Sequence, residues 1–168
     1  KESLSETPRI RLIRGFATAA ECRWLVALVR QRLAPATVFD TDTGAQVTDS
    51  SRDNSFLVLR IGEMNLLTEV IRQRISAGTR LPVPLFEPSQ VLHYAVGQRF
   101  EPHHDFLDPT NSAYHDSLAR FGQRIATFLI YLNDGYEGGE TSFLKIRMTY
   151  RAKQGDALAL QAFARAGR

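Results

Sequence analysis

The strongest constraint on the fold is a change of pattern in the middle of the chain, at Pro82 and Pro84. Before these prolines, apolar residues recur at the three- and four-residue spacing of amphipathic helices. After them come short apolar or alternating runs that are separated by turn residues, which is the pattern of β-strands. Two helices followed by closely spaced strands predict an α+β domain in which the helices pack on a β-sandwich or barrel.

The first half contains two predicted helices. Thr18 and Glu21 form a capping box, which satisfies free backbone amides at a helix start. Apolar residues then recur at helical spacing until Pro35: Cys22, Leu25, Val26, Val29 and Leu33. A second helix is predicted over residues 63–75, with Gly78 as its C-cap. Short strands are predicted over residues 10–13 and 55–61, and a surface loop over the polar residues 40–53.

The second half is predicted to consist mainly of strands. Residues 90–96 alternate, with Leu92, Tyr94 and Val96 on one face. Residues 124–133 are apolar on both faces, which predicts a buried central strand. Turn residues gather at 108–112 and after Asn133. Further short strands are predicted over the segments 142–150 and 156–160.

Length and composition exclude several classes of protein. A chain of 168 residues has room for one domain with its own core. The single cysteine, Cys22, rules out an intramolecular disulfide and a cysteine-based zinc cluster, and it fits a cytoplasmic setting. No run approaches the roughly 20 apolar residues of a membrane helix. The net charge is +3, and the basic residues are interspersed with acidic ones. We therefore expect neither a membrane nor a nucleic-acid partner. The sequence does not indicate an oligomeric state.

The segment His103-His104-Asp105 carries the clearest chemistry. On an extended strand, His103 and Asp105 would share a face while His104 points the opposite way. One imidazole and one carboxylate make two thirds of the 2-His-1-carboxylate triad, which binds Fe(II) and leaves coordination positions open. A hydrogen bond between two surface side chains would explain the pair equally well.

No obvious third ligand completes this triad. The two remaining histidines are His93 and His115. His93 is predicted to face away from Tyr94 as a structural histidine, and His115 to be solvated in a loop or a short helix.

Three ordered blocks resemble the prolyl 4-hydroxylases, which are Fe(II)- and 2-oxoglutarate-dependent dioxygenases. Residues 90–106 resemble the iron-binding segment of that family. Residues 124–134, with the Gly-Gly-Glu-Thr turn that ends at Thr141, resemble its next core strand and turn. The segment 155–158 resembles the strand just before the family's distal histidine. The resemblance implies a double-stranded β-helix (jelly-roll) core over residues 85–168, with a helical region over residues 1–80 packed on one sheet.

The resemblance also implies roles for single residues. His103 and Asp105 match the first two iron ligands, and Tyr94 and Thr141 match residues that contact 2-oxoglutarate. Without such a role, Tyr94 would be an aromatic residue of the core and Thr141 a hydroxyl residue at the start of a strand. Matches to the peptide-binding face are Arg124, Glu87 and Phe100. Arg124 is equally well explained as a surface arginine, and Phe100 stands where the family commonly has a tyrosine.

The implied function is hydroxylation of a prolyl residue in a peptide or protein, with Fe(II), 2-oxoglutarate and O2, and with ascorbate as reductant. One alternative is an oxygenase of the same fold that acts on another substrate, and another is a non-catalytic member that lacks the third ligand. The family places this ligand and a basic residue after the segment that matches 155–158, and no histidine follows here. We therefore expect the closing strands and the third ligand to lie beyond Arg168.

Overall fold

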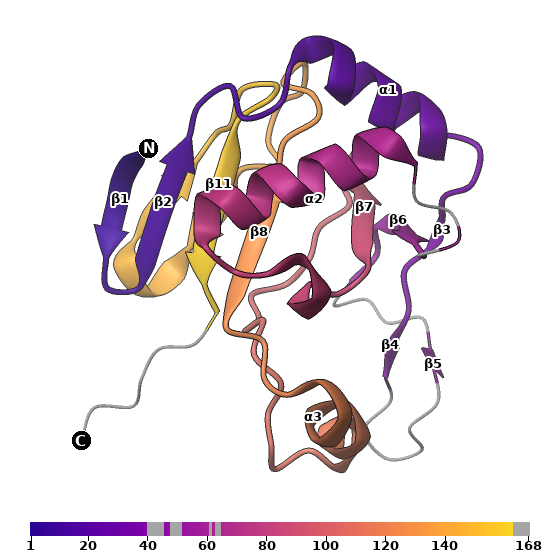
Figure 1. The fold of residues 1–168 in the computed structure, drawn as a ribbon, viewed down its shortest axis with the longest axis vertical. Coiled ribbons are helices and arrows are strands. Elements are labelled where there is room, and N and C mark those ends of the chain that lie inside the picture. Colours follow the sequence, from indigo (N-terminus) through magenta and orange to yellow (C-terminus); the bar gives the residue numbers. More distant parts are fainter. Residues whose placement is uncertain (40–45, 48–51, 61, 63–64, 163–168) are drawn as a thin grey trace.

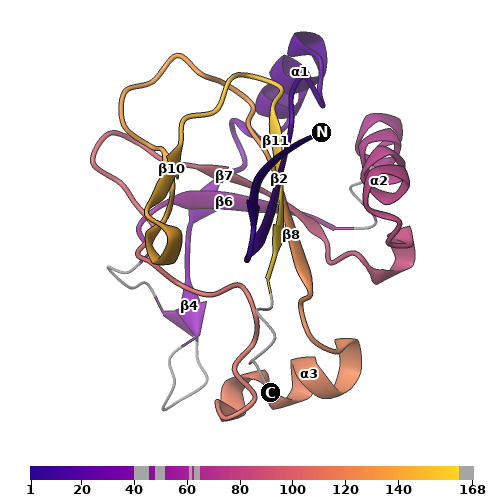
Figure 2. The ribbon, with the colours of Figure 1, turned by 90° about the vertical axis from the view of Figure 1, so that its left-hand side faces the viewer.

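The computed structural model describes residues 1–39, 46–47, 52–60, 62 and 65–162 (Figure 1). Its main sheet is antiparallel, with the strand order β1-β2-β11-β8. The strands of this sheet are β1 (Glu2–Glu6), β2 (Arg9–Ile13), β8 (Ala126–Ile130) and β11 (Ala157–Gln161). Helices α1 (Ala19–Val29) and α2 (Leu66–Thr79) lie on one side of it, and the hairpin that contains β10 (Met148–Tyr150) lies on the other (Figure 2).

Smaller elements complete the described residues. A second sheet has the order β3-β6-β7, and two further pairs, β4 with β5 and β9 with β10, form two-stranded ladders. Their bounds are β3 (Ala34–Pro35), β4 (Val38–Phe39), β5 (Gln46–Val47), β6 (Ser55–Leu59), β7 (Ser89–His93) and β9 (Thr141–Phe143). The remaining helical elements are η2 (Val83–Leu85), η3 (Ser112–Tyr114), α3 (His115–Phe121) and η4 (Leu144–Ile146).

The core lies on both faces of the main sheet. On the hairpin side, Ile10, Leu12 and Leu158 are buried, and side chains of β8, β9 and β10 pack against them. On the helical side, the buried residues of α1 are Cys22, Leu25 and Val29. The Phe16 ring lies 4.9 Å from the Phe128 ring of β8. Burial of apolar side chains on both faces is what holds the helices and the hairpin to the sheet.

The prediction that residues 124–133 form a central strand is wrong. Residues 124–133 contribute β8, which lies at one end of the main sheet and is only half-buried. The inner strands are β2 and β11, and Ala157 and Leu158 of β11 are fully buried. An apolar run indicates that both faces of a strand are covered, but it does not indicate whether both edges are paired. The pairing depends on which segments fold back beside the strand.

The region predicted as helical support also supplies strands. β1 and β2 come from the first 13 residues, and β1 was not predicted at all. Residues 142–150 form a hairpin in which η4 separates β9 from β10, and not a single strand. The strand predicted over residues 90–96 ends at His93, and Val96 is fully exposed. Part of the predicted loop 40–53 lies outside the described residues.

Both helices differ from prediction at their ends. α1 ends at Val29, so Leu33 is outside it, and Val26 is partly exposed. α2 begins after Asn65, which accepts from the Thr68 amide, and Arg80 in the left-handed region (φ 64°) ends it. Gly78 therefore lies within the helix. Apolar spacing indicates which face of a helix is buried, whereas single capping contacts decide where the helix starts and stops.

The predicted capping box of α1 is confirmed and is linked to α2. Glu21 accepts from the Thr18 amide at 2.7 Å, and the Thr18 hydroxyl oxygen accepts from the Glu21 amide at 3.2 Å. Arg74 of α2 forms an ion pair with Glu21 at 2.8 Å. This guanidinium, with the help of the Thr18 amide, lowers the pKa of Glu21 to about 2.

Glu21→Gln is expected to lower the free energy of unfolding by about 1–2 kcal/mol at pH 7, because it removes a charge that serves both a cap and an ion pair. The pKa of Glu21 is depressed in the folded state, so its contribution is complete above pH 4.5 and disappears as the pH falls towards 2. Urea denaturation at pH 7 and at pH 2.5 measures both effects. Glu2→Gln, which removes the exposed Glu2–Arg14 pair, serves as the control and should change stability little. A loss for Glu21→Gln that is equal at both pH values would contradict the ion-pair explanation.

Candidate metal centre

His103 and Asp105 lie side by side, although the strand predicted for them does not form. The segment that follows β7 is irregular, and its contact with the rest of the fold includes an isolated bridge between Phe100 and Arg52. His103 Nε2 is nevertheless 3.4 Å from Asp105 Oδ1. The strand prediction is wrong, but the loop brings the same two side chains together.

In each of these side chains, the atom that faces away from the other side chain is hydrogen-bonded to a neighbouring group. His103 Nδ1 lies 2.8 Å from the Glu101 carbonyl oxygen, and donation to this carbonyl leaves Nε2 with its lone pair. The Thr127 hydroxyl donates to Asp105 Oδ2 at 2.6 Å. The atoms that face one another, Nε2 and Oδ1, therefore both have free lone pairs in the neutral-imidazole form. Second partners of this kind are typical of metal-ligating histidines and carboxylates.

The two groups shift each other's pKa in opposite directions. The neighbouring Asp105 carboxylate raises the pKa of His103, with a smaller contribution from the Glu101 carbonyl. The pKa of Asp105 is lowered, first by His103 and then by the Thr127 hydroxyl. The positive charge of Arg124 acts on Asp105 in the same direction. Asp105 is thus an anion at neutral pH, which is the form that binds a cation.

Phe100 lies against the histidine of the pair. Its ring stacks on the His103 ring with a centroid separation of 3.6 Å and an interplanar angle of 19°. The guanidinium of Arg52 lies 4.9 Å from the centre of the Phe100 ring. Tyr94, directly after β7, is partly exposed, and its pKa is raised mainly by desolvation and lowered in part by the charge of Arg52. Arg52, which the sequence analysis did not single out, thus acts on both Phe100 and Tyr94.

Thr141 is the second predicted cosubstrate contact, and its hydroxyl is 2.7 Å from the Tyr131 hydroxyl. Tyr131 follows β8 and is separated from Thr127 by four residues, so both side chains extend from the same face of the strand. Thr127, near the start of β8, therefore contacts Asp105, and Tyr131, directly after the strand, contacts Thr141. Sequence reasoning missed Tyr131 and Thr127. The signal that could have found them is that Thr127 and Tyr131 are the two hydroxyl-bearing side chains of an otherwise apolar run, four residues apart.

Glu87 and Arg124, both predicted at the peptide-binding face, bind each other. Arg124 donates to the two Glu87 carboxylate oxygens at 2.6 and 2.9 Å. The segment before β7 is held by Arg72, a buried residue of α2. Its guanidinium donates to the Glu87 carbonyl oxygen at 3.1 Å and to that of Val83 at 3.3 Å. Arg72 thereby fixes the backbone from which the Glu87 carboxylate reaches Arg124.

The loop after Asp105 is closed by a side chain that sequence reasoning missed. Gln123 Oε1 accepts from the Leu107 amide, and Gln123 Nε2 donates to the Leu107 carbonyl oxygen, each at 2.7 Å. A carboxamide that pairs with both polar groups of one residue acts like a strand neighbour. Gln123 thus holds the backbone two residues after Asp105 beside the start of β8.

Among the described residues, His103 and Asp105 are the two side chains that could act together as metal donors. The described residues contain no group of three or more His, Cys, Asp or Glu side chains that is arranged to hold a metal ion. His93 is exposed at the end of β7, and His115 starts α3 with Nε2 3.0 Å from the Pro109 carbonyl oxygen. Adjacent ligands of an octahedral ion, each roughly 2.1 Å from it, lie about 3.0 Å apart. The 3.4 Å between Nε2 and Oδ1 is close to this spacing, so the pair fits two neighbouring positions.

His104 points elsewhere. Its Nε2 lies 3.4 Å from Lys145 Nζ, and its ring is 5.1 Å from that of Phe106. It is exposed.

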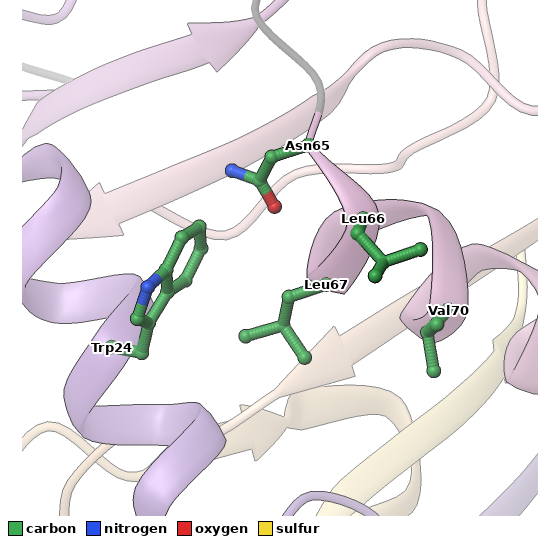
Figure 3. Close-up of a pocket in the computed structure, with 5 residues that line it drawn as sticks. All are labelled: Trp24, Asn65, Leu66, Leu67 and Val70. Atoms are coloured by element: carbon green, nitrogen blue, oxygen red, sulfur yellow. The ribbon is translucent and has the colours of Figure 1, made fainter.

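A separate hollow of about 380 Å³ opens between α1 and α2 (Figure 3). Trp24 of α1 faces Leu67 of α2 across it, and the rest of the lining is Asn65, Leu66 and Val70. These residues offer neither a carboxylate nor an imidazole, so this hollow is no part of the candidate metal centre.

Comparison with known proteins identifies relatives over most of the chain. Residues 89–165 match the family model described as the 2OG-Fe(II) oxygenase superfamily. Probable prolyl 4-hydroxylase 10 of Arabidopsis thaliana is 40% identical over 152 residues, which cover 90% of this chain and 50% of that protein. Prolyl 4-hydroxylase 5 of the same plant is 43% identical over 143 residues, which cover 84% and 47%. The chain thus spans about half the length of the curated relatives it matches.

Solved structures of similar fold carry related names. The viral collagen prolyl hydroxylase of Paramecium Bursaria Chlorella virus-1, in its 2OG complex, superimposes with a TM-score of 0.62 at 24% identity, covering 90% of this chain and 77% of that one. A prolyl-4-hydroxylase of Pseudomonas putida gives a TM-score of 0.57 at 18% identity, covering 91% and 80%. These likenesses confirm the predicted α+β fold class. None of the described helices has the length and apolar character that crossing a membrane requires.

Proposed function

The chain belongs to the 2OG-Fe(II) oxygenase superfamily, and on that premise we propose that it is the core of a dioxygenase that hydroxylates prolyl residues in a peptide or protein. One observation carries the proposal. His103 Nε2 and Asp105 Oδ1 lie 3.4 Å apart. The other two polar atoms, His103 Nδ1 and Asp105 Oδ2, are hydrogen-bonded to neighbouring groups. This arrangement leaves one nitrogen and one oxygen donor directed to a common position.

In the proposed site, His103 and Asp105 hold Fe(II). When bound, Fe(II) supplies, together with 2-oxoglutarate and O2, the oxidising chemistry that defines this class of enzyme. The protein's own part is to fix two donors and to leave other coordination positions free. The Glu101 carbonyl selects the histidine tautomer, and Thr127 selects the carboxylate oxygen.

The third ligand is proposed to be a histidine on the closing strands of a double-stranded β-helix. Two observations support this. Among the described residues, β8 at the end of the main sheet and β7 at the end of the second sheet each pair on one side only. β7 leads into the His103 segment, and β8 carries Thr127. Unpaired strand edges leave backbone amides without partners, so strands that cover both edges would complete the fold next to the metal pair.

Reading the coding sequence that follows Arg168 tests this part of the proposal. A histidine followed by a lysine or arginine, within strands that alternate in polarity, is expected. A gene without such a histidine would favour the non-catalytic alternative.

The cosubstrate is proposed to lie between Tyr94 and Thr141. The Tyr131 hydroxyl orients that of Thr141 at 2.7 Å, and β8 links this position to Asp105. The charge of Arg52 near Tyr94 adds a favourable field for a dianionic ligand. Ascorbate as reductant and a cytoplasmic setting remain predictions.

The peptide is proposed to bind beside Phe100, Arg124 and Glu87. Phe100 places an apolar ring directly on His103, which suits the apolar ring of a proline. Arg124 and Glu87 form a bidentate pair that presents both a cation and an anion to a peptide backbone. A second candidate is an oxygenase of the same chemistry for another substrate. It is favoured by Phe100 itself, which lacks the hydroxyl of the commonly found tyrosine.

Succinate release tests the function. The protein encoded by the complete gene, loaded with Fe(II), is incubated with 2-oxoglutarate, O2 and proline-containing peptides, and with matched peptides in which alanine replaces proline. We expect succinate release that depends on proline, and a mass gain of one oxygen atom on the proline residue. Turnover without peptide oxidation would favour the second candidate. No succinate from a folded, iron-loaded protein would refute the oxygenase proposal.

A further inference from the structure

We infer that Thr127 is a positioning residue of the metal centre, whose hydroxyl fixes the Asp105 carboxylate so that a single oxygen is presented beside His103. The inference rests on the proposed function, because it assigns Asp105 as a ligand. It goes beyond that function because it names a group outside the ligand set that determines how the ligand binds.

The contact between the two residues is short and directional. The Thr127 hydroxyl donates to Asp105 Oδ2 at 2.6 Å, which is the distance expected for a hydroxyl bound to an ionised carboxylate. The Asp105 side chain is about one-third exposed, so water competes only partly for its oxygens. With Oδ2 engaged, Oδ1 is the oxygen that lies 3.4 Å from His103 Nε2. A free carboxylate would rotate and offer either oxygen, or both, to a cation.

The fold places the two partners on elements of different rigidity. Asp105 lies in an irregular segment, whereas Thr127 is part of β8 and pairs with Leu160 of β11. Gln123, just before the same strand, binds both backbone groups of Leu107. Thr127 of β8 thus binds the Asp105 side chain, and Gln123, which precedes the strand, binds the backbone two residues after Asp105. A ligand on a loop is held accurately only when a rigid element supports it.

The residue type agrees with this role. Position 127 is half-buried between apolar neighbours, where valine would fill the same volume. A hydroxyl in such a place costs free energy unless it forms a hydrogen bond. The bond that Thr127 forms is directed to Asp105, so the hydroxyl serves the carboxylate.

Thr127→Val and Thr127→Ser test the inference in the protein encoded by the complete gene. Valine keeps the shape and removes the hydroxyl, whereas serine keeps the hydroxyl. Titration with Fe(II) under anaerobic conditions measures the dissociation constant. We expect Thr127→Val to weaken Fe(II) binding roughly 10- to 100-fold, the usual effect of removing a group that orients a ligand, and Thr127→Ser to stay near wild type.

The chain contains a matched control. Thr110 donates from its hydroxyl to Asp108 Oδ1 at 2.7 Å, a bond of the same type on an exposed loop. Thr110→Val should leave the dissociation constant of Fe(II) unchanged. Equal weakening by Thr127→Val and Thr127→Ser would indicate a packing role and overturn the inference, as would wild-type affinity in Thr127→Val.

Crystal structures of the metal-free variants provide a readout that does not need Fe(II). In Thr127→Val the Asp105 carboxylate should turn away from its wild-type orientation, and in Thr127→Ser it should keep it. If neither wild type nor variants bind Fe(II), the proposed function fails, and these structures still decide whether Thr127 positions Asp105. A carboxylate that stays in place in Thr127→Val refutes the inference.

Discussion

His103→Ala should abolish Fe(II) binding and, with it, all succinate release from 2-oxoglutarate. His103 supplies the nitrogen donor of the described pair, and its Nε2 lies 3.4 Å from Asp105 Oδ1. Alanine removes that donor outright, so we expect the dissociation constant for Fe(II) to rise by more than about 100-fold, beyond the effect of losing an orienting group. Iron content after gel filtration and anaerobic titration both measure the change.

His104→Ala is the control for this variant, because it removes the neighbouring imidazole. His104 is exposed and contacts Lys145 Nζ and the ring of Phe106. Iron binding should stay at the wild-type value in this variant. If His103→Ala retained wild-type iron stoichiometry, His103 would not be a ligand. If His104→Ala lost iron instead, the pair would have been assigned to the wrong histidine.

Gly155→Ala should cost more than about 4 kcal/mol of unfolding free energy, or prevent folding altogether. Gly155 lies just before β11 with φ +85°, and a Cβ atom there would be 2.1 Å from the Ala17 carbonyl oxygen. The neighbouring backbone cannot withdraw easily, because the Gly155 carbonyl accepts from the Ala17 amide at 2.9 Å and its amide donates to Tyr131 at 2.8 Å. The substitution would thus force β11 and the segment that leads into α1 apart.

Gly97→Ala separates the two causes of this loss. Gly97 has the same φ of +85°, but a Cβ atom there would meet nothing within 4 Å. Its substitution should cost about 1–2 kcal/mol, the strain of a left-handed conformation alone. Urea denaturation of both variants measures the difference. Similar losses for the two variants would show that strain, and not the approach of Ala17, makes glycine necessary at position 155.

Much of the fold was predictable because its signals are local. The change of pattern at Pro82 predicted the α+β class, and the buried side of α1 follows the predicted spacing of Cys22, Leu25 and Val29. The capping box of Thr18 and Glu21 forms as predicted, since it involves residues three apart. The position of β11 inside the sheet was not predictable. It depends on β2 and β8 folding back beside it from distant parts of the chain.

Part of the candidate site was likewise predictable from the sequence, and part of it was not. The sequence by itself indicated that His103 and Asp105 could act together, because residues two apart share a face on extended backbone. The structure brings the two side chains together on an irregular segment. The family resemblance, and not spacing, pointed to Tyr94, Thr141 and the remaining contacts.

Only the tertiary structure decided what surrounds the pair. The contacts around the pair join residues that are 16 to 37 positions apart in the sequence. They are the hydrogen bonds of Thr127 with Asp105, of Arg124 with Glu87 and of Gln123 with Leu107. Such contacts depend on strand register, since a shift of one residue would turn Thr127 to the other face of β8. Register is set by packing across the whole sheet. For that reason local patterns predicted the two donors of the proposed metal centre, whereas the packed sheet determined which groups contact them.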